Sequence, residues 1–166
     1  KRLVWQNSWG LTTRTIGVMV LMHGDDKGLV IPPRVAETQV VIIPILFDDS
    51  KDKVLKAANE IKKSLKGLSV LVDDRDYTPG WKFNEWELKG VPVRIEVGPK
   101  DLKDKQAVLV RRDNGKKETV KVKDLGKKVK ETLDDIQDSL FKKAKKSLDD
   151  SIVEAKDWEH FKKAIE

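Results

Sequence analysis

The stretch from Pro79 to Lys100 combines aromatic and charged side chains in a way that suits recognition of unpaired bases. Its aromatic residues are Trp81, Phe83 and Trp86, and its candidate polar contacts are Glu87, Arg94 and Lys100. Aromatic faces stack on bases, while arginine or lysine donates to guanine O6 or N7 and glutamate accepts from a base amino group. On a helix, Phe83 and Glu87 lie one turn apart on the same face. A simpler alternative is that Glu87, Arg94 and Lys100 form surface ion pairs, which contribute little to stability.

A second candidate site lies near the N-terminus, where Gly10, Thr12 and Thr13 precede Arg14. An arginine one turn into a helix, behind a glycine and hydroxyl residues, could bind an anion. Capping of the helix by Thr12 or Thr13 explains the same residues without a ligand. The helix would run to about His23, but the β-branched residues of this segment also fit a strand, and periodicity does not decide between them.

Metal sites have weaker support in the sequence. Cysteine is absent, which excludes disulfides and thiolate zinc sites within this chain, and the two histidines are far apart. Three acidic pairs could ligate Mg²⁺, although capping and loop solvation are the preferred interpretation. These pairs are Asp25-Asp26, Asp48-Asp49 and Asp73-Asp74. Lysine clusters at residues 127–130 and 142–146 are interpreted as solvated helix faces rather than phosphate sites.

The composition is that of a globular chain with a heavily charged surface. Charged residues make up 37% and apolar residues 39% of the 166, and the net charge is +6. This balance permits a polyanionic partner without demonstrating one, because 28 acidic residues are interspersed among the basic ones. The longest apolar runs, 16–22 and 40–47, are too short to span a bilayer. The first residues lack an initiator methionine and a signal-peptide pattern, so we expect an internal part of a longer protein.

Alternating strands and helices are predicted from residue 39 onward. Apolar, β-branched runs predict five strands, at residues 39–47, 68–72, 91–97, 107–112 and 118–122. Apolar stripes at helical spacing predict helices at residues 51–65, 79–90, 124–148 and after Asp157. Residues 3–6 are expected to end a strand, and Pro32-Pro33 to mark a domain boundary. Together these elements predict an α/β fold, a mixed five-stranded sheet flanked by helices on both faces.

Three segments resemble a known protein family. They read WQNSWGLTTRTIG at residues 5–17, GLVIPPRVA at residues 28–36 and PGWKFNEWELKGVPVRIEVGPKDL at residues 79–102. Together they resemble the C-terminal half of the prolyl-tRNA synthetases, in their archaeal/eukaryotic-like form, from about Trp5 to the end. The resemblance implies three pieces. Residues 1–34 would be the end of a class II catalytic domain (motif 3), 35–123 an anticodon-binding domain, and 124–166 the helical lead into a truncated C-terminal zinc-binding domain.

In the first piece, the resemblance implies contacts to ATP and proline. Arg14 corresponds to an arginine that holds an ATP phosphate, and Thr12 to a position beside the nucleotide. The floor of the proline pocket would be formed by Ser8, Trp9 and Gly10. The match also favours a helix over a strand for residues 12–23.

In the second piece, the resemblance implies anticodon recognition. Glu87, Arg94 and Lys100 correspond to residues that read the two guanines of the proline anticodon, and Phe83 to an aromatic residue beside those bases. The implied parent is a cytoplasmic, homodimeric enzyme that ligates proline to its tRNA through prolyl-adenylate. It would use ATP with Mg²⁺, without zinc in this part of the chain and without a membrane partner.

Departures from the family pattern limit what this chain is expected to do alone. The first two class II motifs and the cysteines of the zinc domain are absent from the sequence. The chain is therefore expected to recognise the anticodon but not to activate proline. Two alternatives stay open: a stand-alone RNA-binding accessory module, and a doubly wound small-molecule binder. The catalytic-type residues 5–14 argue against the first, and the lack of a Gly-rich phosphate loop argues against the second.

Overall fold

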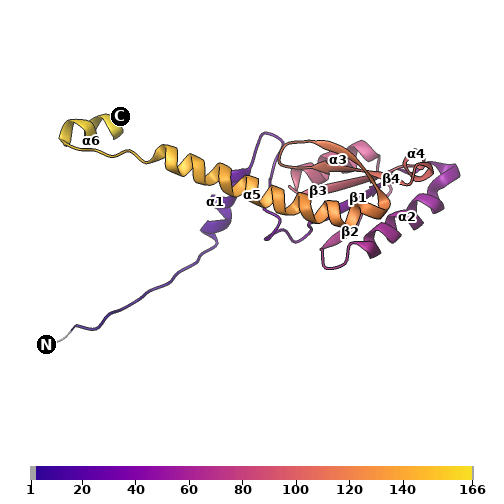
Figure 1. Ribbon diagram of the computed structural model, residues 1–166, viewed down its shortest axis with the longest axis horizontal. Coiled ribbons are helices and arrows are strands. Elements are labelled where there is room, and N and C mark those ends of the chain that lie inside the picture. Colours follow the sequence, from indigo (N-terminus) through magenta and orange to yellow (C-terminus); the bar gives the residue numbers. More distant parts are fainter. Residues whose placement is uncertain (1–2, 166) are drawn as a thin grey trace.

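Five strands form one mixed sheet in the computed structural model, which describes residues 3–165 (Figure 1). The strands are β1 (Val40–Pro44), β2 (Val70–Val72), β3 (Val93–Val97), β4 (Gln106–Arg111) and β5 (Lys117–Lys121). Their order across the sheet is β2-β1-β3-β4-β5. Strand β1 is parallel to β2 and β3, whereas β3–β4 and β4–β5 are antiparallel pairs. The predicted mixed five-stranded α/β fold is therefore confirmed.

Within residues 3–165, six α-helices and two short 3₁₀ turns accompany the sheet. The α-helices are α1 (Arg14–His23), α2 (Lys51–Ser64), α3 (Pro79–Leu88), α4 (Pro99–Lys103), α5 (Leu125–Ser151) and α6 (Trp158–Ile165). The 3₁₀ turns are η1 (Asp48–Ser50) and η2 (Val122–Asp124). None of the helices among residues 3–165 has the length and apolar character needed to cross a membrane.

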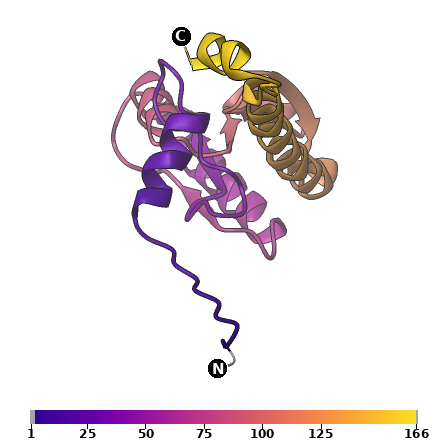
Figure 2. The same cartoon turned by 90° about the vertical axis from the view of Figure 1, so that its left-hand side faces the viewer.

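Two local predictions near the N-terminus have different outcomes. The segment that fitted either a helix or a strand forms α1, as the family resemblance favoured. The predicted strand end at residues 3–6 is wrong, because this stretch is exposed and pairs with no strand in the part of the chain that the structure describes. Residues 3–13 lead away from the sheet (Figures 1 and 2).

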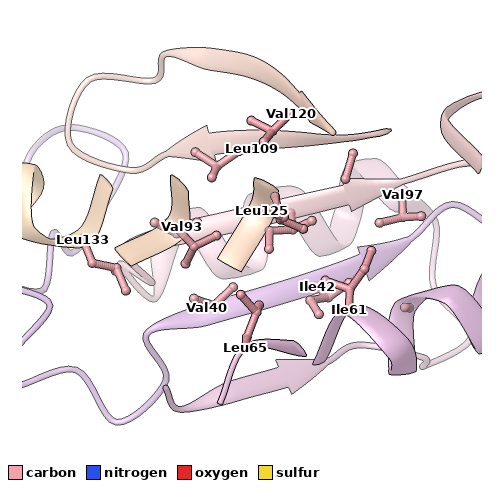
Figure 3. Packing of buried hydrophobic residues seen from close by; sticks show 14 of the residues in the cluster. Val40, Ile42, Ile61, Leu65, Val93, Val97, Leu109, Val120, Leu125 and Leu133 are labelled. Atoms are coloured by element: carbon pink, nitrogen blue, oxygen red, sulfur yellow. The ribbon is translucent and has the colours of Figure 1, made fainter. Parts of the chain in front are cut away.

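One face of the sheet is covered by α2 and α5, which enclose the larger hydrophobic core (Figure 3). Alternate residues of the strands point to this side, including Val40 on β1 and Val93 beside it on β3. The predicted apolar stripes supply the helical partners, such as Ile61 on α2 and Leu133 on α5. Strand β1 is buried at all five positions, as expected for a central parallel strand covered on both faces.

The other face of the sheet is only partly covered. Val41 and Ile43 of β1 pack there against Phe83 and Trp86 of α3 in a second, smaller core. The next strand, β3, turns a charged residue, Arg94, toward this side, in register with Val41. Helix α3 therefore leaves a polar strip of sheet beside it, and this strip forms the floor of the site described below.

Helix α3 is positioned at both ends by local sequence. Thr78 is the N-cap, with its side chain accepting from Trp81 N, and Pro79 occupies the first turn. Beyond the C-terminal end, Gly90 adopts a φ of 73°, and an added Cβ would lie 2.5 Å from Leu29 O. Gly90 therefore packs directly against Leu29. The segment that contains Leu29 is also joined to α3 by a hydrogen bond, because Leu29 N donates to Leu88 O at 2.9 Å.

Replacing Thr78 with alanine should lower the free energy of unfolding by about 1 kcal/mol, since it removes the side-chain acceptor at the start of α3. The shift in urea midpoint at constant m-value measures the loss. Thr78→Ser keeps the acceptor and should recover most of the stability. Equal midpoints for the alanine and wild-type chains would show that this cap contributes nothing.

Candidate nucleic-acid interface

A cavity of about 290 Å³ lies on the polar strip between α3 and the β4–β5 hairpin. Its basic lining residues are Lys27, Arg94, Arg111, Arg112 and Lys117. Phe83 and Trp86 contribute aromatic walls, and Glu87 contributes a carboxylate. Three of the four residues predicted to contact bases, namely Phe83, Glu87 and Arg94, thus line one cavity. The fourth, Lys100, lies exposed on α4 beyond the end of β3 and is not part of this lining.

Arg94 lies over an aromatic ring in this cavity. Its guanidinium carbon lies 4.5 Å from the centroid of the Phe83 ring. Nε and Nη2 donate to Glu96 Oε1 at 3.0 and 2.9 Å, and Nη1 donates to the Phe83 carbonyl at 3.4 Å. These contacts use three of the five guanidinium N–H groups, so two have no acceptor among residues 3–165. A preorganised planar donor with two free N–H groups suits the paired acceptors of guanine.

Glu87 offers a carboxylate to the same cavity. Its Oε1 lies 3.2 Å from Lys27 Nζ, and the glutamate side chain is 28% exposed. The predicted alternative of ion pairing therefore applies to Glu87 and Arg94 in the structure as it stands. The Lys27–Glu87 pair does not exclude recognition of a base, because an exposed ion pair of this kind is weak and can open for a ligand. Arg94 can keep its partner Glu96, since two of its N–H groups are still free for a base.

Arg112, which the sequence did not single out, joins three elements at the edge of the cavity. Its side chain is 4% exposed. Nε donates to the Glu87 carbonyl at 2.8 Å, while Nη1 and Nη2 donate to the two oxygens of Asp25 at 2.7 and 2.6 Å. The hydrogen bonds from Arg112 lower the pKa of Asp25 to about 2. Asp25 thus has a buried arginine partner. The interpretation of Asp25 as a capping or solvated loop residue did not include this partner.

Asp73 also departs from the interpretation of the acidic pairs as caps or solvated loop residues. Its side chain is fully buried and accepts from Arg75 Nη2 and Trp86 Nε1, both at 2.7 Å. Burial raises the pKa of Asp73, but the hydrogen bonds from Arg75 and Trp86 outweigh it and bring the pKa to about 2. Among residues 3–165, clusters of three His, Cys, Asp or Glu with metal-ligand geometry are absent. Through its hydrogen bonds with Trp86 and Lys82, Asp73 anchors α3 to the loop after β2.

The residues predicted to contact ATP and proline do not line this cavity. Ser8, Trp9 and Gly10 are in the exposed segment before α1 (Figure 1). Thr12 Oγ1 accepts from Arg14 N at 3.3 Å, which brings these two residues together locally. Thr13 occupies the N-cap position of α1 without a side-chain hydrogen bond. The roles of these five predicted site residues stay predictions.

The sequence of this chain is similar to the sequences of known proteins. A protein family described as "Anticodon binding domain" matches residues 39–132. The chain is 50% identical to the bifunctional glutamate/proline–tRNA ligase of Cricetulus griseus, covering 100% of this chain and 12% of that protein. It is 47% identical to the cytoplasmic proline–tRNA ligase of Arabidopsis thaliana (98% and 32% covered) and 50% identical to the proline–tRNA ligase of Ruminiclostridium cellulolyticum (98% and 34%). The chain thus spans about a third, or less, of these relatives.

Proposed function

This chain belongs to the anticodon-binding domain family, and we propose that it recognises the anticodon of proline tRNA as one part of a proline–tRNA ligase. The observation that carries this proposal is the grouping of Phe83, Glu87 and Arg94 around one cavity on the uncovered strip of the sheet. The similarity to proline–tRNA ligases along nearly the whole chain supports the choice of tRNA.

The cavity offers each type of contact that a guanine needs. Arg94 donates to O6 and N7 through its free N–H groups, and Glu87 accepts from the base amino group. Phe83 provides a ring beside which a base stacks. Lys100 extends this set from α4 and donates to the second guanine as the bound anticodon follows β3 toward its end.

The whole ligase joins proline to its tRNA in two steps. Proline attacks the α-phosphate of ATP through its carboxylate and releases pyrophosphate, and the tRNA 3′-terminal hydroxyl then attacks the prolyl-adenylate carbonyl and releases AMP. Arg14 stabilises phosphate charge, with Thr12 beside the nucleotide, and the proline pocket includes Ser8, Trp9 and Gly10. Mg²⁺ accompanies ATP. The ligase is a cytoplasmic homodimer in which residues 1–34, 35–123 and 124–166 form the three pieces given above.

Glu87→Gln tests the proposed recognition through a ratio of affinities. Wild type should bind proline tRNA more tightly than the same tRNA with its anticodon guanines replaced. The variant should reduce that preference by about 1 kcal/mol, or roughly five-fold, because an amide oxygen accepts more weakly than a carboxylate. Filter binding or fluorescence anisotropy with both tRNAs measures the ratio, which cancels the general gain in RNA affinity from removing a negative charge.

Glu131→Gln is the matched control, since Glu131 pairs with Lys127 on α5, outside the cavity lining. It should leave the preference unchanged. Equal binding of both tRNAs by the wild-type chain would contradict the proposed function itself. A preserved preference in Glu87→Gln would remove Glu87 from the residues that read the anticodon.

A further inference from the structure

We propose that Lys27 binds a phosphate of the RNA strand whose bases enter the cavity. Lys27 lies in the turn that follows α1, outside the segment 39–132 that matches the anticodon-binding family. This inference rests on the proposed anticodon recognition and adds a contact from a separate part of the chain. The interface would then be built by two segments rather than by the sheet domain alone.

The turn that carries Lys27 has a defined conformation. Asp25 and Gly28 form a bridge, with Asp25 N donating to Gly28 O at 3.1 Å and Gly28 N donating to Asp25 O at 3.0 Å. Lys27 N donates to Asp25 Oδ1 at 2.9 Å. Gly28 has a φ of 122°, and an added Cβ would lie 2.7 Å from Leu88 O. The turn is therefore closed on itself and pressed against the C-terminal end of α3.

Arg112 fixes this turn to the edge of the cavity. The Arg112 side chain is 4% exposed. Its guanidinium donates to both carboxylate oxygens of Asp25 and to the carbonyl of Glu87. Paired hydrogen bonds of this geometry impose orientation as well as strength. Because Lys27 follows Asp25 by two residues, this arrangement places the Lys27 ammonium group beside the Glu87 carboxylate.

Lys27 differs from the arginines of the cavity in its exposure and its pairing. Its side chain is 67% exposed, whereas those of Arg94, Arg111 and Arg112 are 14%, 13% and 4% exposed. The arginines are held by Glu96, Asp113 and Asp25 respectively. Lys27 pairs instead with Glu87, whose carboxylate is proposed to accept from a base. Because an ion pair this exposed is weak, the ammonium group can leave it and approach an adjacent phosphate, whichever base occupies the cavity.

A phosphate contact predicts a specific change in salt dependence. Binding of proline tRNA by the full 166-residue chain is measured over a range of KCl concentrations, for wild type and Lys27→Ala. Lys27→Ala should reduce the slope of log K against log salt by about 0.7 to 1, because one fewer counterion is released. At moderate salt its affinity should fall about five-fold, equally for proline tRNA and for tRNA with altered anticodon guanines. Lys127→Ala on α5, which removes an exposed lysine that also pairs with a glutamate, should change neither quantity.

Asp25→Ala tests whether the turn must be held in place. This variant keeps Lys27 but removes the acceptor of Arg112. The slope of log K against log salt should therefore fall by the same amount as in Lys27→Ala. Asp25→Glu should restore part of that slope. Urea unfolding confirms that each variant is folded. An unchanged slope in Lys27→Ala overturns the phosphate contact, as does a loss of anticodon preference alone, which would make Lys27 only the partner of Glu87. If wild type shows no anticodon preference, the proposed function fails instead.

Discussion

Replacing Arg94 with lysine should remove most of the preference for the proline anticodon while leaving the net charge of the chain unchanged. The expected loss of discrimination is about 1–3 kcal/mol, or roughly 5- to 150-fold in the ratio of affinities. Lysine supplies a point charge but no planar fork, so it cannot donate two parallel hydrogen bonds from a position over the Phe83 ring. Arg94→Ala should show at least the same loss of preference, together with a weaker affinity for every RNA.

The measurement compares proline tRNA with two tRNAs in which each anticodon guanine is replaced separately. A loss confined to one of the guanines would identify the base that Arg94 contacts. Arg34→Lys is a suitable control, because Arg34 is exposed beside α5 and does not line the cavity. If Arg94→Lys keeps the wild-type preference at both positions, the guanidinium is a structural partner of Glu96 and not a base contact.

The sheet was predictable because its strands carry continuous signals in the sequence. The buried run that forms β1 and the Asp113-Asn114-Gly115 turn between β4 and β5 are strong local patterns. Boundaries were less accurate: the strand predicted to reach Phe47 ends at Pro44, where the chain turns toward η1. Helix α4 was missed, since five residues are too few to show a helical period.

The site could be predicted only where its residues are close in sequence or belong to a recognised motif. Phe83 and Glu87 are one helical turn apart, and Arg94 lies on the next strand. Arg112 and Asp25 are separated by 87 positions, and no periodicity connects them. The sheet brings the end of β4 to the turn after α1, and only the fold reveals this pair. The role of Lys27 depends on that pair and was invisible for the same reason.

Asp73 illustrates a different limit of sequence-based prediction. Charged residues are normally predicted to be exposed, but Asp73 and Lys82 are buried together. A lysine in an amphipathic helix is usually solvated, yet Lys82 on α3 is 2% exposed and its Nζ donates to the Asp73 carbonyl at 3.1 Å. The Asp73 carboxylate in turn accepts from Arg75 and Trp86. Sequence patterns describe which faces are apolar, but they do not show which charges are buried together.

Asp73→Asn should lower the free energy of unfolding by about 3–5 kcal/mol, because it leaves the buried Lys82 ammonium without a nearby carboxylate. Urea unfolding followed by tryptophan fluorescence measures the loss. Asp74→Asn is the matched control, since Asp74 is the exposed neighbour and should change stability by less than about 0.5 kcal/mol. Equal urea midpoints for Asp73→Asn and wild type would contradict the assigned role.

The pKa of the Asp73 carboxylate predicts how this loss of stability depends on pH. Its pKa is about 2 in the folded chain, below the value of about 3.9 for an unperturbed aspartate. The stabilisation by Asp73 should therefore be complete above about pH 4 and should disappear as the pH falls toward 2. The stability difference between wild type and Asp73→Asn should be constant from pH 7 to 5 and then shrink. A difference that stays constant down to pH 2 would mean that the charge of Asp73 is unimportant. A shrinking difference would show that the charge of Asp73 stabilises its cluster with Arg75, Trp86 and Lys82. Trp86 and Lys82 belong to the helix that presents Phe83 and Glu87 to the cavity.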